Sequence, residues 1–489
     1  MVGKIFPETP IHFVIEGSIR SLSRTLNIWD KGSGLGDGDF RSIANTLGAA
    51  DVVGLSCMSE HATMVKRIIS DIRKINPGAF FVWGGTHVMA DPDDAIAHAD
   101  AICISEGELA FNEFLEKFRD GEDYLRVSNF WFRKGSELIK NPCRPLLTND
   151  EMSELPHPLF GEKELIYKVG KGFTPISDGD YLDWEALTYN TMWTRGCPFK
   201  CTYCGNSRFL EIDRGYGRIR HPSVDYMISE IKEAVGKRPF IRSVSFYDDC
   251  LISVSTDVLE EFARKLNKEV GLPFAVYGVT PAHIRREKIQ ILIENGMARV
   301  RLGIQSGSDR VLKFFKRPHR PGLIEEATDI LGEFNRGIFP PIYDIMCDIP
   351  IETHDDIVAT LRLINNLPRP FCTNLFSVRS IPNTELERQL AELSVGISDI
   401  KEEDYRNLAP TYANMLLYLV SIVRVPEFMF ERLVRNAKPA HESSKSFGLA
   451  NTFLKIIFWA QRAYYHIRFR DFTVVFGRFG WVLWRLRIL

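Results

Sequence analysis

The sequence of 489 residues lacks the features that would place it in several simple classes of protein. Its nine cysteines are too few for a disulfide scaffold, and the first residues, MVGKIFPETPIHF, lack the charged and apolar regions of a signal peptide. We therefore expect a cytoplasmic protein. A net charge of −2 offers no general attraction to nucleic acid, so no such partner is expected. No uncharged run is long and apolar enough to predict a membrane span.

Against these absences, the composition is that of a folded protein with a substantial core. Hydrophobic residues make up 45% and charged residues 25% of the chain, and its length predicts two or three domains. Short apolar runs of the buried-strand type alternate with helical patterns, and in the N-terminal part these runs lie at 50–58, 79–87 and 100–108. Such alternation predicts βαβ units, in which helices cover a parallel sheet.

The same alternation returns after a stretch that reads as irregular, at about 120–190. Each later apolar run ends in a polar or glycine-rich loop, and the runs lie at 241–249, 273–279, 299–307, 341–350 and 373–382. We expect these β/α units to form a partial (β/α)6 barrel of the TIM type, with its chemistry at the C-terminal ends of the strands. After about residue 386 the pattern becomes helical.

Three of the nine cysteines lie close together in the stretch WTRGCPFKCTYC, at Cys197, Cys201 and Cys204. Thiolates are the ligands that soft metal sites and iron–sulfur clusters prefer. A structural zinc site usually has a fourth ligand in a second close pair, and the nearest candidates, His221 and Cys250, form no such pair. Three thiolates on a four-iron cluster leave one iron open to a substrate or cofactor. A structural zinc loop and a coincidental grouping remain as alternatives.

The segment CPFKCTYC resembles the CxxxCxxC signature of the radical S-adenosylmethionine (SAM) superfamily, including the aromatic Tyr203 before the third cysteine. The resemblance extends over roughly 190–385 and is to the subgroup with an N-terminal cobalamin-binding domain. Its further motifs are RIRHPSVDYMISEI (218–231), SFYDDCLI (245–252), LIENGMARVRLGIQSGSDRVLKFFKR (292–317) and DIPIETHDDIVATL (348–361).

This resemblance implies a [4Fe–4S] cluster whose ligands are the three clustered cysteines. In such enzymes the open iron chelates SAM, and the reduced cluster cleaves SAM to a 5′-deoxyadenosyl radical. An electron donor such as flavodoxin or ferredoxin is therefore implied as a partner. By the same resemblance, the residues expected to bind SAM are Tyr203, Asp248, Asp249, Gln305, Ser306, Ser308, Ile349 and Pro350.

Several of these residues have simpler interpretations that remain open. Asp248 and Asp249 would accept hydrogen bonds from the SAM ammonium group or serve the substrate, but paired carboxylates also cap loops. Gln305 stands where the family more often has Glu, so it keeps an acceptor but loses the charge. The segment DIPIET lacks both glycines of the family pattern, which argues against close approach of the backbone to SAM there.

The N-terminal part resembles a cobalamin-binding, Rossmann-like domain. Ser56 corresponds to the serine of an S-x-L motif, Gly84 and Gly85 to a GG loop, and SEGE (105–108) to a closing G-E-G-E pattern. The D-x-H-x-x-G motif is missing, so no histidine is assigned to cobalt, and the expected first strand has no residues to form it. Two interpretations stay open: the domain binds cobalamin, or it is a structural remnant.

The C-terminal tail, residues 453–489, contains seven Lys or Arg and one Asp among many aromatics. Such a basic amphipathic stretch is typical of a helix lying on an anionic membrane, here the inner face of the cell membrane. A helix docked on the barrel, with its long basic side chains reaching water, explains the pattern equally well. A membrane location would favour a lipid-like substrate.

Together these observations predict an α/β protein in four parts. A truncated, Rossmann-like, cobalamin-binding-type domain would be followed by a connector, a partial (β/α)6 TIM-like radical SAM core and a helical C-terminal region with a basic tail, at 1–140, 141–190, 191–385 and 386–489. The predicted activity is cobalamin-dependent methylation of an unactivated carbon of a small or lipid-like substrate. A cobalamin-independent radical reaction and a non-catalytic metal-binding module are the alternatives.

Overall fold

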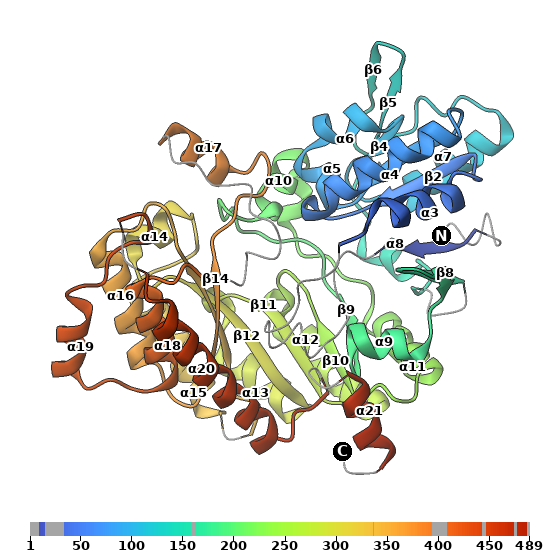
Figure 1. The fold of residues 1–489 in the computed structure, drawn as a ribbon. Coiled ribbons are helices and arrows are strands. Elements are labelled where there is room, and N and C mark those ends of the chain that lie inside the picture. Colours follow the sequence, from blue (N-terminus) through green and yellow to red (C-terminus); the bar gives the residue numbers. More distant parts are fainter. Residues whose placement is uncertain are drawn as a thin grey trace. The chain divides into compact units, whose positions relative to one another are not determined.

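The computed structural model describes residues 9–14, 34–158, 163–335, 337–393, 408–442, 446–473 and 477–486. The chain divides into two compact units (Figure 1). The first unit comprises Met1–Trp184, Cys204–Gly217 and Ile381–Glu387, and the second comprises Glu185–Tyr203, Arg218–Ser380 and Arg388–Leu489. Each unit is described by itself.

The first unit is built on a five-stranded sheet with the strand order β2-β3-β4-β5-β6. Its parallel strands are β2 (Val52–Ser56), β3 (Phe80–Gly84) and β4 (Ala101–Cys103), and its antiparallel strands are β5 (Phe130–Lys134) and β6 (Glu137–Lys140). Its helices include α3 (Asp37–Leu47), α4 (Ala62–Ile75), α5 (Thr86–Ala90), α6 (Pro92–His98) and α7 (Glu108–Asp120). The three parallel strands are those predicted from the apolar runs.

Helix α4 shows how the sequence builds this core. Its apolar residues recur at helical spacing, and Val65, Ile68, Ile69 and Ile72 are all buried. They share one hydrophobic cluster with the strand residue Trp83. Burial of such a stripe against a sheet is what stabilises a helix of this kind.

The stretch expected to be irregular contains regular structure. Strands β5 and β6 form a hairpin around Gly135, whose φ of 63° suits a tight turn. A separate three-stranded sheet has the order β1-β7-β8. These strands and the adjacent helices are β1 (Ile11–Phe13), β7 (Glu164–Lys168), β8 (Gly172–Pro175), α8 (Asn149–Ser153) and α9 (Asp178–Glu185). These strands have three to five residues, too few to show a period, and unlike the equally short β2, β3 and β4 they do not lie in an apolar run that the sequence analysis identified.

The second unit contains a six-stranded sheet in which every neighbouring pair is parallel. In spatial and chain order the strands are β9 (Thr188–Thr191), β10 (Ser243–Phe246), β11 (Phe274–Val279), β12 (Met297–Gln305), β13 (Ile342–Cys347) and β14 (Cys372–Ser377). Sequential parallel order with intervening helices is the arrangement of a β/α barrel, and β9 and β14 are the outer strands of this sheet. The predicted fold class is thereby confirmed.

Helices connect these strands. Those within the second unit are α11 (Val224–Lys237), α12 (Thr256–Lys265), α13 (Arg286–Glu294), α14 (Asp309–Phe314), α15 (Leu323–Glu333) and α16 (His354–Asn366), while α10 (Gly205–Ile212) belongs to the first unit. The later helices are α17 (Glu385–Glu392), α18 (Tyr412–Ile422), α19 (Glu427–Val434), α20 (Gly448–Arg468) and α21 (Gly477–Arg485).

Helix α20, the basic amphipathic segment of the tail, is docked on the second unit. Arg462 donates from Nη1 to Asn374 Oδ1 of β14 at 2.8 Å, and Gln461 donates from Nε2 to the Ile422 carbonyl of α18 at 3.2 Å. The docked arrangement, one of the two expected from the sequence, is therefore present. Within the described residues, no helix has the length and apolar character to cross a membrane.

Candidate active site

Asp248, at the end of β10, anchors the start of the cysteine loop. Its carboxylate accepts a hydrogen bond from the Trp193 backbone N–H at 3.1 Å and from Thr194 Oγ1 at 2.7 Å. Burial raises the pKa of Asp248 to about 7, although the hydrogen bonds from Thr194 and Trp193 act in the opposite direction. The structure thus shows Asp248 holding the backbone that leads to Cys197, while Asp249 beside it is half-buried. Their contact with SAM stays a prediction.

The three clustered cysteines follow this anchor. Cys201 is buried, and Cys197 and Cys204 are half-buried. Arg317 Nη1 lies 3.8 Å from Cys201 Sγ and donates to the Tyr203 hydroxyl at 3.1 Å. A guanidinium beside the loop suits the negative charge of thiolate ligands.

The donor chemistry of this loop fits a [4Fe–4S] cluster better than a single metal ion. In the described part of the chain, no group of three or more His, Cys, Asp or Glu side chains is arranged to hold one metal ion. The ligands of a cluster bind different irons, so their sulfurs are not expected to converge on one point. Three free thiols, of which Cys197 and Cys204 are half-buried and Cys201 is buried, and a neighbouring guanidinium are consistent with that mode of binding.

Two further groups lie at neighbouring strand ends: Cys250, which the sequence analysis set aside for lack of metal-ligand spacing, and His283, which it did not identify. Cys250, which follows β10, has its sulfur 3.9 Å from Cys197 Sγ and 3.8 Å from His283 Nδ1. His283 belongs to the short 3-10 helix η5 (Pro281–His283) after β11, and its ring stacks on Phe199 with centroids 5.1 Å apart. Only the alignment of parallel strand ends brings these residues together, and no spacing in the sequence reveals it.

Gln305, at the end of β12, has an unusual environment. It is 7% exposed, its φ is 75°, and its Oε1 atom has no hydrogen-bond partner in the described structure. A buried acceptor without a partner is costly, so its presence points to a ligand that donates to it. This residue fits a polar contact with SAM.

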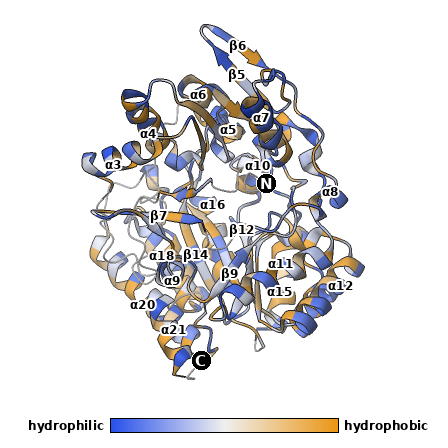
Figure 2. Cartoon of the chain, turned by 90° about the vertical axis from the view of Figure 1, so that its right-hand side faces the viewer, coloured by the Kyte–Doolittle hydropathy of each residue, from blue (hydrophilic) through white to orange (hydrophobic). Residues whose placement is uncertain are grey.

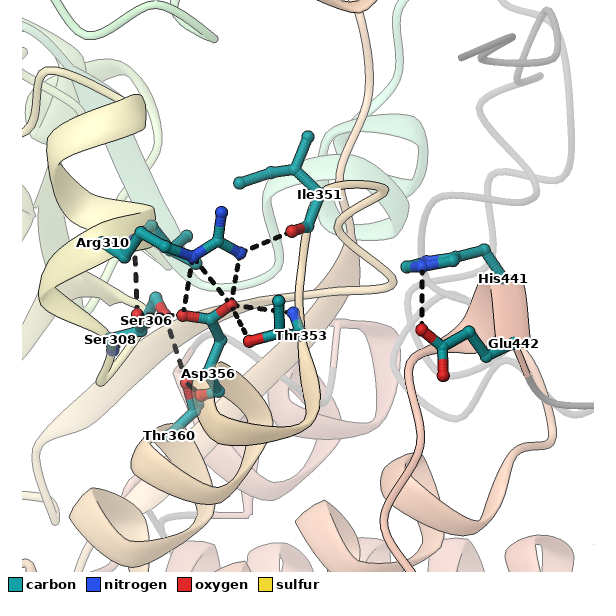
Figure 3. Close-up of polar contacts among 10 residues, drawn as sticks. Ser306, Ser308, Arg310, Ile351, Thr353, Asp356, Thr360, His441 and Glu442 are labelled. Atoms are coloured by element: carbon teal, nitrogen blue, oxygen red, sulfur yellow. Dashed lines mark hydrogen bonds and ion pairs between the residues drawn. The ribbon is translucent and has the colours of Figure 1, made fainter. Parts of the chain in front are cut away.

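Ser306 and Ser308 have partners inside the chain, as Figure 3 shows. The Ser306 hydroxyl lies 3.1 Å from Thr360 Oγ1. The Ser308 hydroxyl donates to Asp356 at 2.5 Å and accepts from the Val311 N–H, which caps α14. The predicted contacts of both serines with SAM remain predictions, and their visible role is to shape the loop after β12.

A network around Asp356 joins the loops that follow β12 and β13 (Figure 3). Arg310 bonds the Asp356 carboxylate and donates to the Ile351 carbonyl at 2.5 Å, and Thr353 caps α16 through the same carboxylate. Burial acts to raise the pKa of Asp356, but the hydrogen bonds from Arg310, Ser308 and Thr353 outweigh it and hold that pKa well below its usual range. The two segments assigned to SAM by resemblance are therefore physically coupled.

The loop after β13 places Ile349 and Pro350 next to a buried acid. Ile349 is buried and Pro350 is half-buried, so Pro350 is the more accessible of the two to an adenine ring. Glu352 is buried, and burial raises its pKa to about 8. Glu352 and Asp348 line a small cavity together with Asn414 of α18, whose amide donates to Asp348 at 2.7 Å.

In the first unit, Ser56, Gly84 and Gly85 lie together where β2 and β3 end. A Cβ on Gly85, whose φ is 89°, would stand 2.6 Å from Ser56 Oγ, so the loop requires glycine here. Ser56 itself is exposed. Ser105, at the end of β4, has a buried hydroxyl without a partner in the described structure. Glycine backbone without side chains, together with a serine hydroxyl that has no partner among the described residues, lies at the carboxyl edge of this parallel sheet. Such an edge fits a nucleotide-like cofactor such as cobalamin.

His87, in helix α5 of this unit, has protein partners. The His87 ring lies 3.2 Å from Ser59 Oγ through Nδ1 and 3.0 Å from Asp94 Oδ2 through Nε2. Both ring nitrogens are thereby used in hydrogen bonds.

Comparison with known families agrees with this geometry. Residues 191–364 match the radical SAM superfamily, and residues 38–115 match the B12 binding domain. An uncharacterized methyltransferase of Pyrococcus horikoshii is 23% identical over 65% of this chain and 64% of its own length. The cytidylyl-2-hydroxyethylphosphonate methyltransferase of Streptomyces wedmorensis is 24% identical over 80% of this chain and 74% of its own. The chain thus spans a little under two thirds of the first of these relatives.

Among solved structures, the radical SAM methyltransferase TsrM of Kitasatospora setae shares the fold. Its complex with tryptophan and a SAM analogue superposes with a TM-score of 0.58 at 16% identity, covering 73% of this chain and 69% of TsrM. Another structure of TsrM holds cobalamin and a [4Fe–4S] cluster.

These matches confirm the predicted family and, at the level of the family, its enzymatic nature and its cofactors. The radical SAM domain implies a [4Fe–4S] cluster and SAM, and the B12 binding domain supports cobalamin rather than a structural remnant. The chain therefore contains a radical SAM domain at residues 191–364, preceded by a B12-binding domain at residues 38–115.

Proposed function

We propose that this protein is a radical SAM enzyme that methylates an unactivated carbon atom with the help of cobalamin. The observation that carries the proposal is the presence of both domains in one chain. Methylation of an unactivated carbon needs a carrier for the methyl group and a radical that activates the carbon. The B12-binding domain would provide the carrier, and the radical SAM domain would provide the radical. The substrate class that we propose is a small or lipid-like organic molecule.

The residues proposed for the cluster are Cys197, Cys201 and Cys204, with Arg317 balancing their charge. The cluster, when bound, supplies the electron that cleaves SAM, and cobalamin supplies a carrier for the methyl group. Asp248 fixes the backbone ahead of Cys197 and so sets the position of the first ligand. These assignments rest on the motif and on the local contacts of the loop.

For SAM we propose contacts with Tyr203, Asp249, Gln305 and Pro350, supported by the unpartnered Oε1 of Gln305. We propose that the remaining predicted residues hold the loops in position and do not contact SAM themselves. Asp248, Ser306 and Ser308 have protein partners, and Ile349 is buried. For cobalamin we propose Ser56, Gly84 and Gly85, at the edge of the sheet where Ser105 also lies.

The wider setting is part of the same proposal. Cleavage of SAM consumes an electron, so a reduced flavodoxin or ferredoxin is the proposed partner. Free thiols and a reduced cluster require a reducing compartment, which supports the cytoplasm. We also propose the division into a cobalamin-binding domain, a connector, a radical SAM core and a helical region at 1–140, 141–190, 191–385 and 386–489.

The test begins with protein produced anaerobically with cobalamin supplied and its cluster reconstituted. Mass spectrometry would measure cobalamin per chain, and liquid chromatography would measure 5′-deoxyadenosine and S-adenosylhomocysteine after addition of SAM and a reductant. We expect close to one cobalamin per chain and formation of S-adenosylhomocysteine that depends on cobalamin.

The control is Cys201→Ala, which should abolish 5′-deoxyadenosine formation while leaving bound cobalamin unchanged. Formation of 5′-deoxyadenosine without any effect of cobalamin would replace the proposal by a cobalamin-independent radical reaction. One zinc per chain, with no iron or sulfide, would instead support a non-catalytic metal-binding module.

A further inference from the structure

Helix α20 turns a face of mixed polar and apolar residues to the protein and a stripe of apolar residues outward. On the inner face, Asn451 donates to the Thr411 carbonyl at 3.1 Å and Arg462 donates to Asn374 at 2.8 Å. His466 lies 2.7 Å from the Asp471 carbonyl through Nδ1, and Phe458 packs edge-on against Tyr418. Tyr465 of the same face packs against a buried hydrophobic cluster that includes Phe339, so polar and apolar contacts together fix this face to the second unit.

The opposite face of α20 is apolar and exposed. Leu449 is 93% exposed, Phe453 63%, Ile456 59% and Ile467 63%. Together with the exposed Ala460 and Ala463, these residues recur at alternating steps of four and three, which forms one continuous stripe along the helix. Scattered apolar residues on a surface are common, but a contiguous stripe marks a surface that contacts something.

Helix α21 also has a side packed against the protein and exposed apolar residues. Its Gly477 and Gly480 are buried, and Trp484 stacks under Arg242 of the second unit at 4.8 Å. Phe479 and Val482 remain 59% and 43% exposed. Both helices are labelled in Figure 2, where each carries hydrophobic and hydrophilic residues.

The charges of this region have one sign. Residues 446–489 contain one acid, Asp471, and it is occupied by an ion pair with Arg299. The basic residues exposed on and beside the two helices are Arg468, Arg470, Arg478 and Arg485. A second copy of this chain would bring like charges together, whereas an anionic bilayer would complement them.

We propose that the exposed apolar stripe of α20, extended by α21, docks this protein on an anionic lipid surface. The apolar side chains would enter the interfacial layer, the arginines would meet the headgroups, and neither helix would cross the membrane. Docking on a lipid surface would not require α20 to unfold or detach, because its inner face keeps its contacts with the second unit.

The test is sedimentation of the full-length protein with vesicles. We expect binding to vesicles of phosphatidylcholine and phosphatidylglycerol at a ratio of about 7:3, at least about tenfold stronger than to phosphatidylcholine alone and weakened by salt. The double variant Phe453→Glu/Ile456→Glu should lose at least about tenfold in binding. Ile467→Glu, near the other end of the stripe, provides an independent variant.

The matched control is Asn267→Glu/Gln290→Glu, which adds two carboxylates at exposed positions outside α20 and α21. It should bind vesicles like the parent protein, and circular dichroism should show that all variants are folded. The proposal is overturned if the parent protein does not bind the anionic vesicles, or if the stripe variants bind as well as the control. A dimer in sedimentation velocity that the stripe variants dissociate, without vesicle binding, would assign the stripe to a second copy instead.

Discussion

Side chains at the strand ends of the second unit have different roles in the candidate site, and the role of Cys250 is the one that most needs a test. Its sulfur is 3.9 Å from that of Cys197, although Cys250 lies outside the CxxxCxxC segment. It is buried, and burial together with its contact with Cys197 raises the pKa of its thiol. Because Cys250 lies outside the CxxxCxxC segment, whose three thiols are the proposed cluster ligands, we assign it a packing role beside the cluster loop.

This assignment predicts that Cys250→Ala retains the iron and sulfide content of the parent protein after reconstitution, whereas Cys201→Ala loses most of both. Iron and acid-labile sulfide analysis, with the electron paramagnetic resonance spectrum of the reduced protein, would measure the effect. Loss of iron from Cys250→Ala to the level of Cys201→Ala would make Cys250 a ligand.

Glu352 predicts a pH dependence of stability. Its pKa in the folded protein is about 8, raised by burial and by the nearby Asp348 and Asp356. The unfolded chain titrates at about 4.3. Between these values the folded protein binds a proton that the unfolded chain releases, so this group makes stability fall as pH rises through that window.

Glu352→Gln removes the titration and keeps the shape of the side chain. We expect the Tm of the variant, relative to the parent protein, to increase between pH 5 and pH 8.5. Thermal unfolding followed by circular dichroism at both pH values would measure it. A difference in Tm that does not change with pH would show that Glu352 does not titrate in this window.

At the scale of elements, the turn between β3 and α5 is the part of the first unit that tolerates least change. A Cβ on Gly85 would approach the backbone N and O of Cys57 to 2.9 Å, in addition to its contact with Ser56. Gly85→Ala should therefore shift this turn and lower the cobalamin retained per chain several-fold.

The chain offers a matched control in Gly121, which ends α7. Gly121 also has a positive φ, of 70°, but a Cβ there would meet nothing within 4 Å. Gly121→Ala also places a Cβ at a positive φ, in the left-handed helical region, and should leave cobalamin retention unchanged. Equal retention in both variants would remove the turn from the proposed cobalamin site.

Elements of this chain could be predicted where they were long or ended in a recognisable loop. Strands β2 to β4 of the first unit and β10 to β14 of the second were expected, because each pairs an apolar run with a polar end, whereas β9 was not predicted. The hairpin of β5 and β6 and the sheet of β1, β7 and β8 were missed because their strands are short and lie outside the apolar runs that the sequence analysis identified. Within the candidate site, the three cysteines could be identified from their motif. His283 and Arg317 are far from the cysteines in the sequence, and only the folded structure shows that they lie near them.

At the scale of the whole molecule, one buried ion pair attaches the tail to the sheet of the second unit. Arg299 of β12 bonds Asp471, and their side chains are 6% and 15% exposed. Asp471→Ala would leave the guanidinium buried and unpaired, so we expect a loss of about 3–5 kcal/mol in the free energy of unfolding. Chemical denaturation followed by circular dichroism would measure it.

The double variant Arg299→Met/Asp471→Leu tests the cause of that loss. Because it removes both charges, it should recover a large part of the lost stability. If it is as unstable as Asp471→Ala, the loss comes from packing at this position and not from the unpaired charge.

The separation of this pair along the chain also bears on how the protein is made. Arg299 and Asp471 are 172 residues apart, so β12 leaves the ribosome long before its counter-ion has been synthesised. Until then the nascent sheet holds a guanidinium that it cannot bury at low cost, and its completion waits for the tail.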